Sequence, residues 1–371
     1  MSISRRITAV AVAALVAAGV SACNSSDNNG SSSGGSSSGG SQASGTIALL
    51  LPETATTRYE SFDRPLFEAK AKELCPDCKI LYQNANQQAD QQRSQAQSVL
   101  AQGAKVLVLD PVNGETAGSI VQLAKAKQVP VISYDRLVQN ADLDYYISFD
   151  NEKVGKLQGT ALVDKLKKDG KTSGNIVMIN GDIKDNNAKL FNKGARSVLD
   201  GSGFKTVPTP DFFTPDWKPA NAQSFMNAQI ARLGKTGFVG VYAANDGTAG
   251  GAIAAMRANG VNPIPPITGQ DAELAAIQRI VSGEQYMTVY KAYKPEADQA
   301  AQLAVDLIRG NKPQATATVN NGQKDVPSFL LTPVAVTKEN VKDTVVKDEL
   351  WTAAKICTGQ YAAACSAAGL S

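Results

Sequence analysis

Short apolar runs alternate with longer amphipathic stretches along most of this chain, and this alternation constrains its fold more than any other feature. Runs such as KVLVLDP and NIVMING are short and rich in Val, Ile and Leu, as buried strands are. The stretches between them, such as QQRSQAQSVLAQG, have the apolar spacing of a helix and often stop at glycine, which favours helix C-termini. Strands that alternate with helices form βαβ units around parallel sheets covered on both faces. The sequence therefore predicts the α/β fold class.

Strand candidates recur from Thr46 onward. Their ranges are 46–52, 79–85, 105–111, 129–135, 145–150, 175–181, 238–246, 265–271 and 286–291. The body from Thr46 to Ser371 is longer than one hydrophobic core usually serves, so we expect two domains.

The first residues have the pattern of an export signal. Arg5 and Arg6 precede an apolar run that ends directly before Cys23. The ending GVSAC resembles the lipobox of bacterial lipoproteins, in which the cysteine carries the lipid. The Gly/Ser tract that follows has too few apolar side chains to fold and behaves as a flexible tether. We expect a signal peptide at 1–22, a lipidated Cys23 with its tether at 23–45, and a location on the outer face of the cell membrane.

The charge balance argues against a nucleic-acid partner. The chain has 37 Lys and Arg against 34 Asp and Glu, and removal of the signal would take away Arg5 and Arg6. The remaining basic residues form no stripe of the kind that nucleic-acid-binding proteins carry.

Four cysteines besides Cys23 stand in two close pairs, Cys75 with Cys78 in CPDC and Cys357 with Cys365. In the cytosol a C-x-x-C motif indicates redox chemistry or half of a zinc site. This chain is expected to be exported, contains no histidine, and has no second C-x-x-C to complete a zinc site. Two structural disulfides are favoured, and a redox role for CPDC is the alternative.

Polar residues stand where nearly every predicted strand ends. They are Asp110, Asp135, Arg136, Asp150, Asn151, Asn180, Asp182, Asp185, Asn187, Asn245, Asp246, Gln270, Asp271 and Lys291. Ligands of open parallel sheets bind outside the carboxyl ends of the strands. Helix capping is the alternative, since Asp and Asn are preferred caps, and it accounts for Asp150, Asn151 and Asp246. It does not account for Arg136 and Lys291, because cations are disfavoured at helix N-termini.

Catalysis is disfavoured. Without histidine the usual base of Ser and Cys triads is missing, and no phosphate-binding glycine motif follows a strand. A carboxylate pair of the glycosidase type remains open, with Asp135, Asp185 and Asp271 as candidates. Neighbouring Asn, Arg and Lys would lower the pKa of these carboxylates, whereas a general acid needs a raised pKa. We expect no enzymatic activity.

Binding of a neutral polyol fits these residues better. Sugar hydroxyls both donate and accept, so planar Asp, Asn and Arg groups can engage two hydroxyls at once. The C–H face of a sugar ring favours an aromatic platform. Trp217 is one candidate, with ordinary packing as its alternative, and Tyr59 and Phe62 are others.

Longer motifs carry a resemblance to a known family. YDRLVQNADLDYYISFDNEKVG, DNNAKLF, NDGTAGGAIAA, TGQDAELAAI, MTVYK and NNGQKDVPSFLLTPVAVTKENVKDTVVKD closely resemble the type I periplasmic sugar-binding proteins of bacterial ABC importers, in their xylose-binding branch. The similarity runs in order from about Thr46 to Leu350. The tether, the CPDC motif and the tail with Cys357 and Cys365 lie outside it or depart from it.

The resemblance implies two Rossmann-like lobes with parallel sheets, joined by a three-strand hinge. The expected N-terminal lobe is 46–150 plus 292–328, the C-terminal lobe is 151–291 plus 329–355, and 356–371 is a tail. The hinge crossings are expected near Asp150–Asn151, near Tyr290–Ala292 and in FLLTPVAV.

The resemblance also implies a set of ligand-binding residues. Carried over motif by motif, they are Asp135, Arg136, Asp185, Asn187, Asn245, Asp271 and Lys291, with Trp217 as the stacking ring. The segment ETATTRYES departs from the family by about one residue in register. There we expect Arg58 as a further ligand residue and Tyr59 or Phe62 as a second stacking ring.

The function implied is that of an extracytoplasmic solute-binding lipoprotein. It would act as a monomer without cofactor or metal, capture a monosaccharide between its lobes and deliver it to an ABC permease in the membrane. The resemblance favours D-xylose, although glucose, arabinose or another aldose would need only small changes in the pocket. A sugar sensor that presents the closed form to a membrane receptor is the alternative. A sugar-responsive repressor would need a DNA-binding headpiece where this chain has a lipobox and a tether.

Overall fold

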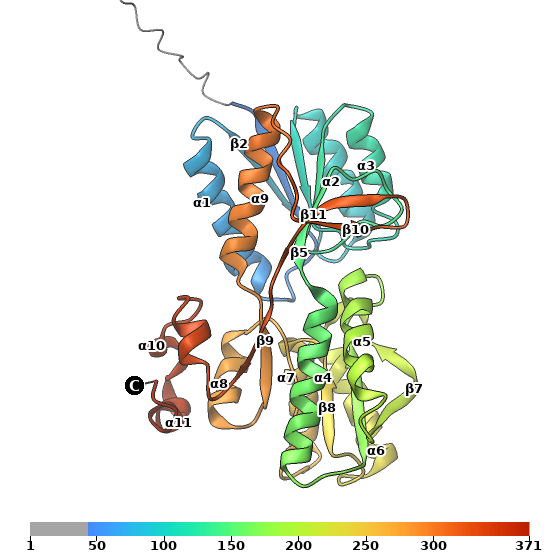
Figure 1. Cartoon of the computed structure of the whole chain (residues 1–371), viewed down its shortest axis with the longest axis vertical. Coiled ribbons are helices and arrows are strands. Elements are labelled where there is room, and N and C mark those ends of the chain that lie inside the picture. The colour runs from blue at the N-terminus through green and yellow to red at the C-terminus, as the bar shows by residue number, and fades with distance from the viewer. Residues whose placement is uncertain (1–43, 371) are drawn as a thin grey trace, which may run out of the picture. The chain divides into compact units, whose positions relative to one another are not determined.

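The computed structural model of the chain describes residues 44–370 (Figure 1). The predicted signal peptide, the lipidation candidate Cys23 and nearly all of the tether lie outside the described residues. Among the helices that the structure describes, none has the length and apolar character of a membrane span.

The first lobe is built on a seven-stranded sheet with the order β10-β11-β5-β4-β3-β1-β2. All neighbours are parallel except β10 and β11, which pair antiparallel. The strands are β1 (Thr46–Leu51), β2 (Lys79–Asn84), β3 (Val106–Leu109), β4 (Val131–Tyr134), β5 (Tyr145–Phe149), β10 (Ala317–Asn320) and β11 (Asp325–Leu331).

Helices cover both faces of this sheet. Ile47 and Leu49 of β1 lie in one hydrophobic cluster, whereas Ala48 and Leu50 lie in another. Successive side chains of the strand point to opposite faces of the sheet, so each face has its own core. The first core includes residues of α1 (Arg64–Leu74) and α9 (Tyr293–Ile308), and the second includes residues of α2 (Ala89–Ala101) and α3 (Gly118–Lys125). A π-helical turn, η1 (Tyr59–Asp63), leads into α1.

The second lobe is built on a sheet with the order β7-β6-β8, whose strands are parallel. The strands are β6 (Asn175–Asn180), β7 (Lys205–Phe213) and β8 (Gly240–Ala243). Backbone hydrogen bonds continue from β8 through residues 266–271 to β9 (Met287–Tyr290), for example from Thr268 N to Val241 O and from Val289 N to Gly269 O. β12 (Val334–Thr337) pairs antiparallel with β9 at the far side.

Helices pack on both faces of the second lobe as well. Residues of α4 and α5 share one core with β6, and residues of α6 and α7 share another. The helices are α4 (Asn151–Lys168), α5 (Asn186–Leu199), α6 (Pro219–Leu233), α7 (Asp246–Ala258) and α8 (Leu274–Ser282), with a 3-10 turn, η2 (Pro215–Trp217), before α6.

The chain passes between the two sheets three times. β5 ends at Phe149 and α4 begins at Asn151, and β9 ends at Tyr290 before α9 returns to the first lobe. The third passage lies between β11 and β12, at residues 332–333. β11 therefore continues beyond residue 328, where the sequence predicted the first lobe to end, because Phe329 to Leu331 still pair with β5.

Two sequence expectations about strands differ from the structure. The sequence did not predict β7, since Pro208 and Pro210 interrupt it; its place at the edge of the sheet explains why they are tolerated. The expected strand at 265–271 is wrong as a full strand, because only Ile267 forms a bridge there. This segment nevertheless lies between β8 and β9.

The C-terminal residues pack on the second lobe. After a π-helical turn, η3 (Lys342–Val346), the chain forms α10 (Ala353–Ile356), η4 (Gly359–Tyr361) and α11 (Ala362–Ala367). Ile356, Cys365 and Leu370 share a core with Ile277 and Ile280 of α8, so the predicted tail is part of the packed body. The structure contains both disulfides, Cys75–Cys78 and Cys357–Cys365, with Cα–Cα distances of 5.3 and 5.6 Å.

Candidate functional site

A pocket of about 260 Å³ lies at the carboxyl ends of the strands of both lobes. Its lining residues are Thr56, Arg58, Tyr59, Asp135, Arg136, Asp185, Asn187, Phe191, Trp217, Asn245, Gln270, Asp271 and Lys291. The structure thus brings together every residue that the sequence predicted for ligand binding. The pocket is also lined by Tyr59, one of the two candidates for the second stacking ring, and by Thr56, Phe191 and Gln270.

Arg58 occupies the first-lobe wall in a buried ion-pair network. Its Nε and Nη2 bond both carboxylate oxygens of Asp63 at 2.8 and 2.7 Å, Nη2 also bonds Glu296 at 2.6 Å, and Nη1 bonds Asp135 at 2.9 Å. The Arg58 guanidinium therefore makes four hydrogen bonds to protein carboxyl groups, and one of them holds Asp135 in place. Asp63 accepts a further hydrogen bond from the Tyr134 hydroxyl.

Arg136 extends from the end of β4 into the centre of the pocket. Its Nε lies 3.2 Å from an Asp185 oxygen and 3.7 Å from an Asp110 oxygen, and its Nη2 donates to the Tyr59 hydroxyl at 3.0 Å. Glu53 lies further along, 3.6 Å from Nη2. Three carboxylates from both lobes thus surround one guanidinium.

Asp135 joins the two lobes through both its backbone and its side chain. Its φ of 53° is in the left-handed region, and its carbonyl accepts from Ser148 Oγ at 2.7 Å and from Asn187 Nδ2 at 3.0 Å. Burial alone would raise the pKa of its carboxyl, but the charges of Arg58 and Lys291 lower the pKa below its ordinary value. Asp135 therefore stays ionised at neutral pH.

Two predicted second-lobe residues serve as helix caps and also line the pocket. Asp185 accepts the Asn187 N–H at 2.8 Å at the start of α5, and Asn245 accepts the Thr248 N–H at 2.9 Å at the start of α7. Capping and pocket lining are thus compatible roles. Asp246 does not cap α7 as expected: its carboxylate accepts from Gln285 Nε2 at 2.7 Å and from Glu273 N at 2.9 Å.

The pKa of Asp185 also departs from the sequence expectation. Burial raises it to about 6, against the lowering effect of Arg136. Arg136 was expected to lower the pKa of this carboxyl. Asp185 is only 4% exposed, however, and the cost of burying its charged form outweighs the effect of Arg136.

Lys291 and Asp271 complete the polar wall at the end of β9. Lys291 Nζ lies 3.3 Å from Asp271 Oδ1 and 3.6 Å from Asp135 Oδ1, so one cation links carboxylates of both lobes. Burial lowers the pKa of Lys291, but Asp135 and Asp271 raise it further, and the net change is upward. Gln270 Nε2 donates to the other Asp271 oxygen at 3.1 Å.

Trp217 forms the aromatic wall. Its Nε1 donates to Asp185 Oδ2 at 3.2 Å, and its ring meets Phe191 edge to face with centroids 6.4 Å apart. The ring lies directly over Gly181. The candidate Phe62 does not line the pocket, because it packs on Tyr293 and Trp351 instead.

The sequence interpretation missed Thr56 and Phe191, which line the pocket, and three acidic residues behind it. Phe191 is four residues after Asn187 on α5 and therefore lies on the same helix face. This spacing could have predicted that Phe191 lies in the pocket with Asn187. Glu53, Asp63 and Glu296 are each 1% exposed or less and hold Arg58 or Arg136. No local pattern distinguishes them from solvated charges in the sequence.

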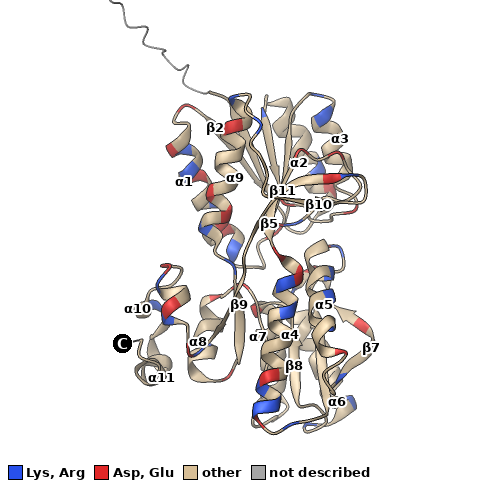
Figure 2. Cartoon of the chain, viewed as in Figure 1, with Lys and Arg blue, Asp and Glu red and all other residues tan. Residues whose placement is uncertain are grey.

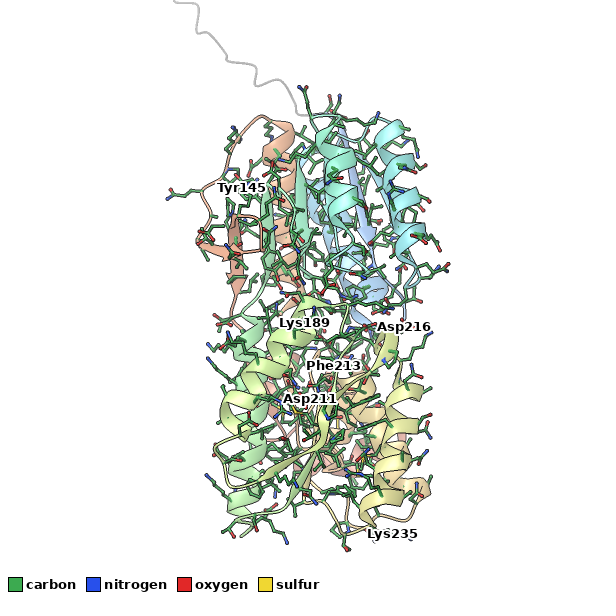
Figure 3. The ribbon with its side chains drawn as sticks, turned by 90° about the vertical axis from the view of Figure 1, so that its right-hand side faces the viewer. Tyr145, Lys189, Asp211, Phe213, Asp216 and Lys235 are labelled. Carbon is green, nitrogen blue, oxygen red and sulfur yellow. A yellow bond between two sulfur atoms is a disulfide. The ribbon has the colours of Figure 1, made fainter. Side chains whose placement is uncertain are left out.

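Contacts at the rim of the pocket also join the two lobes. The Gly114 N–H bonds the Lys184 carbonyl at 3.1 Å, and Lys189 Nζ bonds Glu115 at 2.7 Å. Gln87 Nε2 donates to the Asp216 carbonyl at 3.2 Å. Figure 3 labels Lys189 and Asp216 where the second lobe meets the first. The structure therefore shows the lobes in contact.

Several buried polar atoms of the pocket lack a hydrogen-bond partner among the described residues. They include Arg136 Nε, Gln270 Oε1 and Asp271 Oδ1. One donor and two acceptors of residues that line the pocket thus have no hydrogen bond, although Arg136 Nε and Asp271 Oδ1 lie within ion-pair distance of Asp185 and Lys291. This combination matches a solute whose hydroxyls donate as well as accept.

Metal and nucleic-acid chemistry find no support in the described residues. Within residues 44–370 no group of three or more His, Cys, Asp or Glu is placed to hold a metal ion. Figure 2 shows acidic and basic residues mixed along α1 and α4.

Comparisons with known proteins agree with this geometry. A family model of the periplasmic binding protein domain matches residues 47–312. The D-xylose-binding periplasmic protein of Escherichia coli is 44% identical over 307 residues, which cover 81% of this chain and 89% of that protein. The multiple sugar-binding periplasmic receptor ChvE of Rhizobium radiobacter is 34% identical over 321 residues, covering 82% of this chain and 90% of that protein.

A solved structure has the same fold. It is an ABC transporter solute binding protein from Clostridium phytofermentans with bound β-D-glucose. It superposes with a TM-score of 0.78 at 30% identity and covers 84% of this chain and 99% of its own.

Proposed function

This chain belongs to the periplasmic binding protein family, and on that premise we propose that it captures a monosaccharide, D-xylose, outside the cytoplasm and delivers it to an ABC permease. The observation that carries the proposal is a pocket between two lobes, lined by Trp217 and by polar side chains with atoms that make no hydrogen bond in the described residues, namely Arg136 Nε, Gln270 Oε1 and Asp271 Oδ1. Similarity to a D-xylose-binding protein supports the choice of sugar.

The charges of the pocket favour a neutral solute. Arg58, Arg136 and Lys291 are already paired with the carboxylates around them. An anionic or cationic solute would compete with these pairs, whereas sugar hydroxyls can add to them as donors or acceptors. The proposed ligand contacts are those expected from the sequence, namely Arg58, Asp135, Arg136, Asp185, Asn187, Trp217, Asn245, Asp271 and Lys291.

Binding would be coupled to closure of the lobes. A solute that contacts Asp135 in the first lobe and Asp271 in the second binds the closed form more tightly than the open form, so it shifts the population toward closure. The closed form would then dock on the permease. No bond of the solute is broken in this proposed cycle.

We also propose that Cys23 anchors the protein to the outer face of the membrane through a lipid. The lipobox-like GVSAC and the Gly/Ser tract support this proposal. Cys23→Ala should release the protein from the membrane fraction, and mass spectrometry of the N-terminal peptide should lose the lipid mass. A wild-type N-terminal peptide without lipid would contradict the proposed anchor.

A thermal-shift screen over aldoses tests the proposed function. A ligand that binds only the folded state at a hundred times its Kd adds about 2.7 kcal/mol to stability. D-Xylose should raise Tm more than D-glucose or L-arabinose, and calorimetry should give one site per chain. Absence of a shift with every aldose would overturn the proposal.

A sensor function is supported by the 34% identity to a protein described as a receptor. The solute site would be the same in both cases. A pull-down of membrane proteins with the sugar-loaded form, from cells with and without the permease genes, separates the two functions. A membrane receptor captured in the absence of the permease would indicate a sensor, and capture of the permease would indicate a transport component.

A further inference from the structure

The turn that carries Asp271 is held in a strained conformation. Asp271 and Ala272 have φ values of 95° and 50°, and neither is glycine. Such backbone conformations persist only where the surroundings hold them. Asp271 lines the pocket, and its Oδ1 makes no hydrogen bond, although Lys291 Nζ lies 3.3 Å away. The contacts that hold this turn therefore decide where that oxygen lies.

Two aromatic side chains hold the carbonyl groups of this turn. The Tyr293 hydroxyl donates to the Asp271 carbonyl, and the Trp351 Nε1 donates to the Ala272 carbonyl at 2.8 Å. Tyr293 begins α9 of the first lobe, whereas Trp351 follows η3 in the C-terminal part of the second lobe. The turn is therefore held from two sides.

Phe62 connects these two aromatic rings. Its centroid lies 5.4 Å from that of Tyr293 and 5.1 Å from that of Trp351, the second contact with an interplanar angle of 78°. Phe62 belongs to η1, the same turn that brings Tyr59 to the pocket. We call Phe62, Tyr293 and Trp351 the aromatic triad. Its members come from both lobes and meet beside the solute site.

The segment after Trp351 fixes the indole in place. Trp351 is 9% exposed and shares a core with Ile277, Ile356 and Cys365. Gln278 Nε2 of α8 donates to the Ile356 carbonyl at 3.2 Å. The C-terminal segment, which lies outside the resemblance to the sugar-binding family, thus supports a side chain that bonds the residue next to Asp271.

We propose that Trp351 is a positioning residue for solute binding, which holds the Ala272 carbonyl through its Nε1 hydrogen bond and so aims the Asp271 carboxylate into the pocket. This inference rests on the proposed function for the identity of the solute. Since Phe62 meets Trp351 across the lobes, the triad also links closure to the geometry of Asp271.

Trp351→Phe tests the proposal, because it keeps an aromatic ring but removes the Nε1 donor. Hydrogen exchange of the Asp271, Ala272 and Glu273 amides should speed up at least tenfold in the solute-free protein. The amides of β3 should be unchanged. The Kd for D-xylose should rise at least fivefold, mostly through faster dissociation. Phe62→Leu, which removes a ring but no hydrogen bond, should produce a smaller change in the same direction.

Phe225→Leu is the matched control. Phe225 stacks on Phe212 with centroids 3.8 Å apart in the same lobe, and neither ring lines the pocket. This variant should lower Tm but leave the exchange of residues 271–273 and the Kd unchanged.

The outcomes separate this proposal from the proposed function. Unchanged exchange at 271–273 in Trp351→Phe overturns the positioning role, whatever solute binds. Faster exchange with an unchanged Kd overturns it as well, because the turn would then move without affecting the solute. If the wild type binds no aldose, the proposed function fails. The exchange rates at residues 271–273 then decide by themselves whether Trp351 holds the turn in place.

Discussion

A methyl group on Gly181 would lie 1.9 Å from Cη2 of Trp217, so the indole occupies the space that a side chain would fill. Gly181 has no positive φ, and alanine is therefore acceptable to its backbone. We expect Gly181→Ala to displace the indole from Asp185 and to raise the Kd for sugar at least tenfold, measured by calorimetry. Gly201→Ala is the control, because nothing lies within 4 Å of a methyl group there. Equal affinities for both variants would contradict the role of Trp217.

Asp271→Ala should weaken sugar binding tenfold or more. A hydrogen bond to a charged group contributes about 1.5–3 kcal/mol, and this carboxylate has one oxygen without a hydrogen-bond partner in the described residues. The variant also leaves Lys291 with Asp135 as its remaining ion-pair partner. Calorimetric titration checks the change, and an unchanged Kd would remove Asp271 from the site.

Glu115→Gln should change the affinity less than about fivefold. The Glu115–Lys189 pair joins the lobes at the rim, but the Glu115 side chain is 58% exposed, and exposed pairs contribute about 0–1 kcal/mol. A hydrogen bond from Lys189 lowers the pKa of Glu115, so the Glu115 carboxylate is ionised at neutral pH. The same titration as for Asp271→Ala measures this variant. A tenfold loss would mean that the rim rather than the pocket dominates closure.

Stability should fall as pH rises from about 5 to 8. Burial raises the pKa of Asp185 to about 6, of Asp246 to about 7 and of Glu296 to about 8, whereas unfolded carboxyls titrate near 4. Between these values the folded state binds more protons than the unfolded state, so the free energy of unfolding decreases with pH and levels off above the folded pKa. Urea denaturation at half-unit intervals measures the slope. Asp246→Asn should flatten it, and a wild-type stability that rises across this window would contradict the raised pKa values.

The double variant Cys75→Ser, Cys78→Ser should lose stability but not function. A disulfide that closes such a short loop contributes about 2 kcal/mol through the entropy of the unfolded chain. Neither cysteine lines the pocket, so the Kd for sugar should be unchanged. Thermal unfolding and calorimetry measure the two quantities. A loss of transport with normal binding would instead favour the redox role considered for CPDC.

The strand-end residues of the site were predictable because their position follows from topology. Asp135 and Arg136 end one strand and Lys291 ends another, and parallel strands bring such ends to one edge of a sheet. Trp217 was a candidate from its residue type, with ordinary packing as the alternative, and the family resemblance then assigned it as the stacking ring. Phe191 was not predicted, although its spacing from Asn187 carries the information.

The second layer of charges was not predictable in the same way. Glu296 lies in the first turn of α9, where an acidic residue is ordinary, yet it is fully buried against Arg58. Asp63 reaches the same guanidinium from η1. Such pairing depends on how distant helices pack, which local patterns do not encode. The strand β7 was missed for a local reason, because its two prolines are typical of loops.

The three passages of the chain between the sheets restrict how the lobes can move. A single linker would allow one lobe to swivel and slide in any direction relative to the other. Three linkers, at residue 150, at residues 291–292 and at residues 332–333, leave bending about their common line as the low-energy motion. We therefore expect the proposed opening of the lobes to have essentially one degree of freedom, so that a single distance between probes on the two lobes is enough to follow it.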